Sequence, residues 1–372
     1  MSIEQKERNY RQCSKNKLAY LECMRIIAIF FVIFNHTGSS GFFLFAKYPE
    51  NSVPFWLYLF FSIFCRFSVP LFLAITGALM LGRSEEPLTI LWKKRILKII
   101  IILLFWSAVY YLFDNYHAGG VINWKDAIKR LYSSNLKYHL WYLYLYIAYL
   151  ICLPFLKSLV ANLKTKYFYY MFGIALFLEG ILPVAEYFWK QGDISLNSHI
   201  RSMWLISDIV IYPCLGYFLQ YKVDISKIKK KLPFIWIACC LGIGICCYMT
   251  YYKAQITGSW KEGENQTFHQ SFVILICIAI FLSIKYLFVR LSIPNRINQI
   301  ICVFGKATLG VYLIHLIIMN TNIMNNVLSY LRSMGLNYMI GIFIYCFIVM
   351  MIGFGVTIIL SKIPVVKRLV GY

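Results

Sequence analysis

LECMRIIAIFFVIFNH, residues Leu21 to His36, is the stretch of sequence that decides the fold. It lies within an apolar segment, residues 19–38, that is long enough to cross a bilayer as a helix. At about 100° per residue, the positions of Arg25 and His36 differ by three turns, so both side chains lie on one face, roughly 16 Å apart. Glu22 precedes Arg25 by three residues and can form an ion pair with it on that face.

Ionisable side chains are costly inside a membrane, so this face indicates a functional site turned toward the protein interior or a water-filled cavity. The alternative is a structural ion pair together with a hydrogen-bonded histidine at the interface. His36 is suited to general-base chemistry because an imidazole can gain or lose a proton near neutral pH. Arg25 cannot act as a base, but it can hold an anion or orient Glu22.

Apolar segments of similar length recur along the whole chain, which has 372 residues and is 60% hydrophobic. They are too long for barrel strands, so the sequence predicts an all-α polytopic membrane bundle of about ten transmembrane helices. The predicted spans are residues 19–38, 55–81, 96–113, 139–156, 167–189, 203–221, 232–251, 269–288, 301–324 and 338–360.

The net charge of +22 is distributed as a membrane topology predicts. With the N-terminus inside, the cytoplasmic segments hold 23 of the Lys and Arg side chains and the outer loops hold 10. This bias predicts that both termini are cytoplasmic, with a basic segment at residues 1–18 and contacts to anionic membrane lipids. We therefore expect no nucleic-acid partner.

The chain has no linker, internal repeat or soluble extension, so we expect one membrane domain over residues 1–372 without a fused soluble domain. No cysteine has metal-site spacing with a histidine nearby, and we expect no metal. The outer segment 114–138 alternates polar and apolar residues, which predicts an amphipathic helix on the outer surface.

Arg66 lies near the middle of the second predicted span and needs an anionic partner or water there. Glu179 and Asp208, in other spans, are possible partners. Pro70 and Gly77 follow in the same span and can kink the helix or allow a neighbouring helix to approach closely.

A second cationic group, Lys94, Arg95 and Lys98, opens the third span at its inner end. Arg95 and Lys98 are three residues apart and share a helical face. These side chains could hold the phosphates of a cytosolic nucleotide ligand, and the alternative is a simple anchor in the inner leaflet.

Two further elements contain histidine. His139 opens the fourth span, where the sequence favours a solvated residue at the helix end. Tyr312 and His315 are three apart in the ninth span and point the same way, as either a structural or a catalytic pair.

Arg25 and His36 resemble the arginine–ten residues–histidine motif in the first helix of the acyltransferase family 3 membrane proteins. Pro70-Leu71-Phe72 through Thr76-Gly77 is similar to that family's Pro-Leu-Phe-Phe-x-x-Ser-Gly stretch, with Thr76 in place of the usual Ser.

Three more matches follow in family order. Arg95 and Lys98 occupy the place of the family's basic pair, with Lys98 replacing the usual Arg; a lysine can still bind phosphate, as a point charge rather than a fork. His139-Leu140-Trp141-Tyr142-Leu143 and Gly310-Val311-Tyr312-Leu313-Ile314-His315 are similar to the family's His-Leu-Trp-Phe-Leu and Gly-x-Tyr-x-x-His elements.

The resemblance implies an enzyme that takes an acyl group, usually acetyl, from cytosolic acyl-coenzyme A. It would pass that group to a hydroxyl of a cell-envelope glycan or glycolipid at the bacterial plasma membrane. Without a fused extracellular esterase-like domain, the chain looks like a standalone acetyltransferase of the enterobacterial-common-antigen, capsule or exopolysaccharide type.

Within this reading, we expect His36 to be the base, with Arg25 and Arg66 stabilising or positioning anionic groups. Tyr312 or His315 could donate to the oxyanion. Lys94, Arg95 and Lys98 would bind acetyl-coenzyme A as the donor substrate. A covalent acetyl-histidine relay is a second mechanism.

Two alternatives remain at this point. The intramembrane charges could line the path of a transporter or flippase for a glycan or lipid-linked substrate, although the lack of repeats argues against it. A related enzyme could also transfer a different acyl group, such as succinyl.

Overall fold

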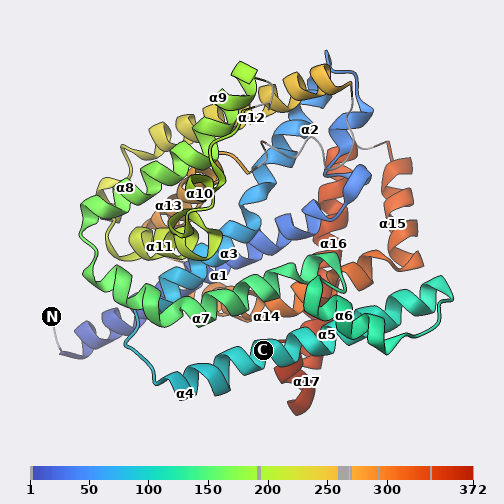
Figure 1. The fold of residues 1–372 in the computed structure, drawn as a ribbon. Coiled ribbons are helices and arrows are strands. Elements are labelled where there is room, and N and C mark those ends of the chain that lie inside the picture. The colour runs from blue at the N-terminus through green and yellow to red at the C-terminus, as the bar shows by residue number, and fades with distance from the viewer. Residues whose placement is uncertain are drawn as a thin grey trace.

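The computed structural model describes residues 3–190, 194–258, 268, 270–291, 293–335 and 337–371. Within these ranges the chain forms helices and no strand (Figure 1). Eight helical segments of this described part are long and apolar enough to cross a membrane. They are Val53–Met80, Leu88–His117, Tyr138–Asn162, Thr165–Trp189, Leu232–Thr257, Val273–Arg290, Asn295–Met319 and Tyr338–Leu360. The predicted all-α membrane bundle is therefore confirmed.

The two other predicted spans, 19–38 and 203–221, correspond to α1 (Ile3–Asn35) and α11 (Asp208–Tyr221). Helix α11 has only 14 residues, and a short 3₁₀ turn at Trp204–Ile206 precedes it. The count of ten spans and the cytoplasmic position of both termini stay predictions.

Several of the crossing segments are interrupted. The first consists of α2 (Val53–Phe64), a 3₁₀ turn (Cys65–Phe67) and α3 (Ser68–Met80). The second segment consists of α4 (Leu88–Ile90), a π-helix (Leu91–Ile96) and α5 (Leu97–Ala118). The third consists of a 3₁₀ turn (Tyr138–Leu140) and α7 (Trp141–Asn162). The fourth consists of α8 (Thr165–Ala175), a π-helix (Leu176–Ile181) and α9 (Leu182–Lys190).

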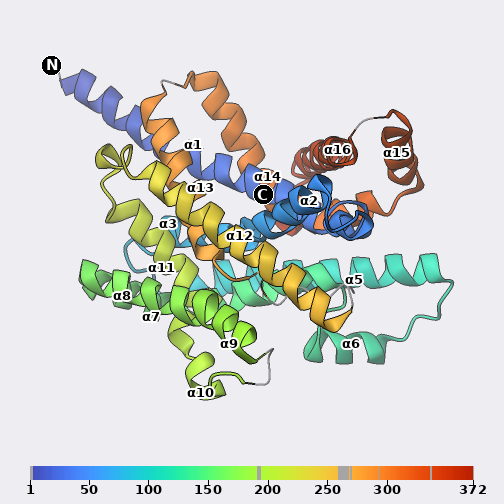
Figure 2. The same ribbon diagram turned by 90° about the horizontal axis from the view of Figure 1, so that it is seen from above.

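The remaining crossing helices are α12 (Leu232–Thr257), α13 (Val273–Arg290), α14 (Asn295–Met319) and α16 (Tyr338–Leu360). Four short helices lie between or after them: α6 (Trp124–Ser133), α10 (Ser198–Arg201), α15 (Asn322–Ser333) and α17 (Pro364–Leu369). Helix α1 packs against α3, α13, α14 and α16, and it runs through the middle of the bundle in Figures 1 and 2. The apolar stretch that contains Arg25 is thus the centre of the fold.

The break between α2 and α3 falls at Arg66, four residues before Pro70. A proline has no backbone N–H, and its ring clashes with the carbonyl of the residue four positions earlier. The helix consequently tightens into a 3₁₀ turn at Cys65–Phe67. Pro70 thereby interrupts the predicted second span at the level of Arg66.

Glycines allow α3 and α11 to pack with their backbones in direct contact. A Cβ atom on Gly216 would lie 1.7 Å from the carbonyl oxygen of Ala74, and one on Gly77 would lie 2.0 Å from that of Pro213. No side chain fits at either position, so these residues bring two helices closer than ordinary packing allows.

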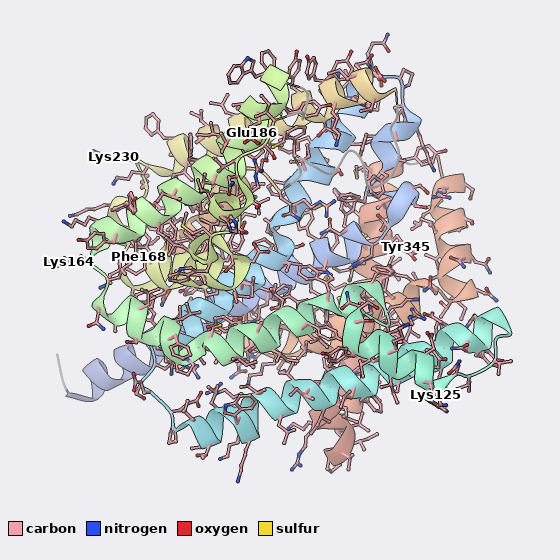
Figure 3. The ribbon with its side chains drawn as sticks, viewed as in Figure 1. Lys125, Lys164, Phe168, Glu186, Lys230 and Tyr345 are labelled. Atoms are coloured by element: carbon pink, nitrogen blue, oxygen red, sulfur yellow. The ribbon has the colours of Figure 1, made fainter. Side chains whose placement is uncertain are left out.

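Three lysines that the sequence assigns to opposite sides of the membrane lie at opposite ends of the bundle. Lys164 and Lys230, both assigned to cytoplasmic loops, lie at the left of Figure 3, whereas Lys125 of an outer loop lies at the right. The predicted surface helix in segment 114–138 is α6, which buries Ala127 and exposes Ile128 and Tyr132.

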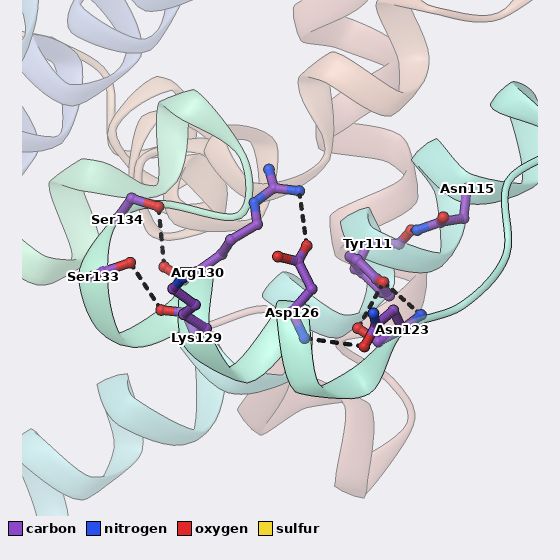
Figure 4. Close-up of polar contacts among 8 residues, drawn as sticks. All are labelled: Tyr111, Asn115, Asn123, Asp126, Lys129, Arg130, Ser133 and Ser134. Atoms are coloured by element: carbon purple, nitrogen blue, oxygen red, sulfur yellow. Dashed lines mark hydrogen bonds and ion pairs between the residues drawn. The ribbon is translucent and has the colours of Figure 1, made fainter.

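Helix α6 is held at its N-terminus by a local polar network (Figure 4). The Asn123 side chain accepts from the Asp126 backbone N–H at 3.2 Å, which caps the first turn. The hydroxyl of Tyr111 on α5 donates to the Asn123 carbonyl and accepts from its N–H, both at 2.9 Å. This network fastens α6 to the C-terminal end of α5.

Candidate active site

Three histidines from distant parts of the chain meet at the end of α1. His36 follows the last residue of α1, His315 lies on α14, and His139 lies in the 3₁₀ turn before α7. The ring centroids of His36 and His315 are 4.9 Å apart, and that of His139 lies 6.3 Å from the first and 5.3 Å from the second. His36 and His315 were both predicted as candidate site residues, and the fold makes them neighbours.

The contacts of His315 determine how the histidine pair is protonated. Its Nδ1 lies 2.7 Å from the Tyr312 carbonyl oxygen, which can only accept, so Nδ1 carries the proton. In the neutral ring Nε2 is then an acceptor, and it lies 3.0 Å from Nδ1 of His36. With both rings neutral, His36 donates from Nδ1, and its Nε2 carries the lone pair that can accept a proton.

His139 is where the sequence interpretation was wrong. A solvated residue at the helix end was favoured, but the side chain is 1% exposed. Its ring packs 4.8 Å from Tyr110 and 5.4 Å from Tyr312, centroid to centroid. Neither ring nitrogen has a hydrogen-bond partner among the described residues. The 3₁₀ turn before α7 directs this ring inward, which the position of a histidine at a span end does not reveal.

A cavity of about 360 Å³ opens among α1, α3, the π-helix before α5, α7 and α14. Five cationic side chains line it: Arg25, Lys94, Arg95, Lys98 and Lys306. We call it the cationic cavity. The predicted cationic cluster and Arg25 therefore belong to one site.

Two of these cations are fixed by carboxylates. Arg25 pairs with Glu22 at 2.8 Å, as the sequence predicted, and Gly305 on α14 leaves the room that the Glu22 side chain occupies. Arg95 pairs with Glu86 at 2.6 Å. Lys94 and Arg95 lie in a π-helical turn, a feature that often marks functional sites, and Lys98 follows in the first turn of α5.

Lys306 was missed by the sequence analysis. It lies on α14, lines the cavity and precedes His315 by nine residues. The rule that singled out Arg25, that a charge in an apolar span needs a reason, applies equally to Lys306. Thr76, which replaces the Ser of the resembled motif, also lines this cavity.

A second cavity, of about 290 Å³, lies beyond the first and contains His36 and His139 in its wall. We call it the histidine cavity. Arg66 lines it and places its guanidinium carbon 4.5 Å from the centroid of the Phe42 ring. Asp208 lines the same cavity, whereas Glu179 lines a small separate one.

Tyr312 and His315 differ in their access to the cavities. Tyr312 lines both, and its hydroxyl donates to the carbonyl oxygen of His139. His315 is fully buried and lines neither of them in the described part of the chain; it contacts His36 instead. This placement favours a positioning role for His315, in which it orients His36, rather than a role as a hydrogen-bond donor to the substrate.

No group of three or more His, Cys, Asp or Glu side chains in the described ranges is arranged to hold a metal ion. The imidazoles of His36 and His315 are joined by a hydrogen bond, and that of His139 packs against tyrosine rings.

The helices that can cross a membrane enclose a cationic cavity and a histidine cavity with shared lining residues, so the fold and the site define an integral membrane protein with a candidate site inside the bundle. The family model described as an acyltransferase domain matches residues 18–360. The chain belongs to acyltransferase family 3 and is a membrane acyltransferase. Comparisons with curated proteins and with solved structures returned no match.

Proposed function

We propose that this protein transfers an acetyl group from cytosolic acetyl-coenzyme A to a hydroxyl of a cell-envelope glycan or glycolipid, in the plasma membrane of a bacterium. The observation that carries the proposal is the pair of adjoining cavities, one lined by five cations and the other by His36. A donor with several phosphates fits the first, and an uncharged hydroxyl needs a base of the kind the second provides.

The donor is expected to place its phosphates against Lys94, Arg95, Lys98 and Lys306, with its thioester end directed toward the histidine cavity. Arginine and lysine bind phosphate strongly because the N–H groups that hydrogen-bond to it carry positive charge. Arg95 offers a planar fork, and the lysines act as point charges. Arg25 lines the same cavity, is paired with Glu22 and precedes His36 on the same apolar stretch.

The reaction then needs one proton transfer in each direction. Nε2 of His36 takes the proton of the acceptor hydroxyl as its oxygen attacks the thioester carbonyl carbon, and a C–O bond forms. As the C–S bond breaks, the proton passes to the sulfur, giving free coenzyme A and an O-acetyl ester. Charge that develops on the carbonyl oxygen calls for cationic or hydroxyl donors, and Arg25, Arg66 and Tyr312 are the candidates near this path.

A relay through an acetyl-histidine would instead form a bond between the acetyl carbon and His36 Nε2 before the acceptor reacts. Incubation with radiolabelled acetyl-coenzyme A in the absence of acceptor distinguishes the two routes. Direct transfer leaves the protein unlabelled, and a relay labels it at His36.

The experiment that tests the proposed function is the release of free thiol from acetyl-coenzyme A by the purified protein in lipid. The reaction contains a crude extract of envelope glycans and compares the wild type with His36→Ala. Thiol release that requires both the extract and His36 supports the proposal. If the protein neither releases thiol nor binds acetyl-coenzyme A, the result contradicts the proposal and favours the transport alternative.

A further inference from the structure

A residue from a distant part of the chain lines the cationic cavity. Gly371 lies in its wall together with Lys98 of α5 and Lys306 of α14. Gly371 comes two residues after the end of α17, which lies below α5 in Figure 1. We call residues 364–371, which comprise α17 and the two residues after it, the strut.

The strut is fixed to α5 by a hydrogen bond. The indole N–H of Trp106 donates to the carbonyl oxygen of Leu369 at 2.9 Å. The last carbonyls of a helix have no partner within it, and Trp106 satisfies one of those of α17. Val370, the next residue, is 1% exposed. A helix of six residues has little stability of its own, so these contacts keep the strut in place.

The other end of the strut contacts α14. Gly371 has a φ of +75°, a left-handed conformation that glycine adopts at little cost. A Cβ atom at this position would lie 2.3 Å from Cδ2 of Leu309. Leu309 follows Lys306 by three residues, so the two share a face of α14. The strut therefore touches both helices that carry the lysines of the cavity.

The strut occupies the interval between α5 and α14 at the level of the cavity. Farther along the two helices, the Tyr110 hydroxyl of α5 donates to the Leu313 carbonyl of α14 at 2.7 Å. Trp106 precedes Tyr110 by four residues, and Leu309 precedes Leu313 by four. The contacts of the strut thus lie between this direct bond and the two lysines. Apart from the strut, α5 packs mainly against α7, so its separation from α14 near the lysines depends on the strut.

We propose that the strut sets the spacing between Lys98 and Lys306, and thereby the affinity of the cationic cavity for the phosphates of the donor. This inference rests on the proposed function, in which both lysines bind acetyl-coenzyme A. Charge-assisted hydrogen bonds are short and weaken as their geometry degrades. Two lysines on separate helices can contact one ligand at the same time only while the helices hold their separation. Trp106 and Gly371 are consequently positioning residues.

Trp106→Phe loosens the strut at α5. Phenylalanine keeps an aromatic ring but has no N–H to donate to the Leu369 carbonyl. Trp236→Phe is the matched control. The indole N–H of Trp236 on α12 donates to the Ser283 hydroxyl, also at 2.9 Å, and Trp236 lines neither cavity.

Gly371→Ala loosens the strut at α14. The Cβ atom meets Leu309, and alanine is strained at a positive φ. Gly119→Ala is the matched control, because Gly119 has a φ of +61°, meets no atom within 4 Å and lines neither cavity. It imposes the same kind of backbone strain without touching the strut.

The test measures equilibrium binding of coenzyme A to the full-length protein in lipid nanodiscs. We expect Trp106→Phe and Gly371→Ala each to weaken binding by about 3- to 10-fold, the usual effect of losing one hydrogen bond, and both controls to bind as the wild type does. In a Lys306→Ala background the same two changes should weaken binding by less than about 2-fold. One of the two spaced cations is then absent, so the effects are not additive.

The strut proposal and the proposed function fail in different ways. Wild-type affinity in both strut variants, or a loss of the same size with and without Lys306, overturns the role of the strut and leaves the proposed function standing. If Trp106→Phe does not fold, Gly371→Ala decides the question, because Gly371 lies outside the membrane-crossing helices. Absence of any coenzyme A binding by the folded wild type overturns both proposals.

Discussion

Nε2 of His315 lies 3.0 Å from Nδ1 of His36, across a separation of 279 residues in the chain. The opposite nitrogen of His315 is committed to the Tyr312 carbonyl oxygen, which can only accept. With both rings neutral, His36 donates this hydrogen bond, and the lone pair that can accept a proton lies on Nε2 of His36. This relationship gives His36 the form that a general base requires.

Replacing His36 by alanine should remove that base. We expect His36→Ala to lower acetyl transfer by about 10² to 10⁴-fold, the usual contribution of general-base catalysis. Binding of acetyl-coenzyme A should stay close to that of the wild type, because His36 lines only the histidine cavity. Thiol release and donor binding are measured on the same preparation; turnover at the wild-type rate would remove His36 from the mechanism.

Replacing His315 should act through His36. In His315→Leu the Nδ1–H of His36 loses its acceptor, and an unsatisfied buried group costs about 1–3 kcal/mol, or roughly 5- to 150-fold in rate if the productive tautomer is lost. His315→Gln keeps an acceptor oxygen and should recover part of the activity. We expect kcat to fall while KM for the donor is unchanged, with a shifted pH–rate profile in His315→Leu. A purely structural role would instead lower thermal stability equally in both variants.

The cations of the cationic cavity should govern donor affinity. The double variant Arg95→Ala/Lys98→Ala loses two charge-assisted contacts of about 1.5–3 kcal/mol each, so KM for acetyl-coenzyme A should rise by 10² or more with little change in kcat. Lys93→Ala is the matched control, since Lys93 is exposed in the same π-helix and does not line the cavity. An unchanged KM in the double variant would return this cluster to the role of a lipid anchor.

The glycine contact between α3 and α11 should be essential for folding. Gly216→Ala places a Cβ atom 1.7 Å from the Ala74 carbonyl oxygen, where only backbone could move to relieve the clash. Overpacking typically costs about 1–3 kcal/mol, and we expect a clear loss of thermal stability in detergent. Gly244→Ala on α12 meets no atom within 4 Å and should be tolerated. Equal melting temperatures of the two variants would contradict this account of the packing.

The sequence by itself determined whatever depends on local geometry. Bilayer thickness fixes the length of an apolar span, and helical periodicity places Glu22, Arg25 and His36 on one face, so the bundle and the Glu22–Arg25 pair could both be predicted. The same short-range reasoning placed Arg95 and Lys98 together.

Only the tertiary structure decided what depends on contacts between distant segments. His139 was expected in solvent because no local rule shows that α7 begins beside α14. Lys306 belongs to the cationic cavity only because α14 lines it together with the π-helix. The protonation of His36 likewise depends on a partner 279 residues away. Periodicity acts over a few turns of one helix, whereas a site inside a bundle is formed where several helices converge, and that convergence is set by packing, by the Gly77 and Gly216 contacts and by the break before Pro70.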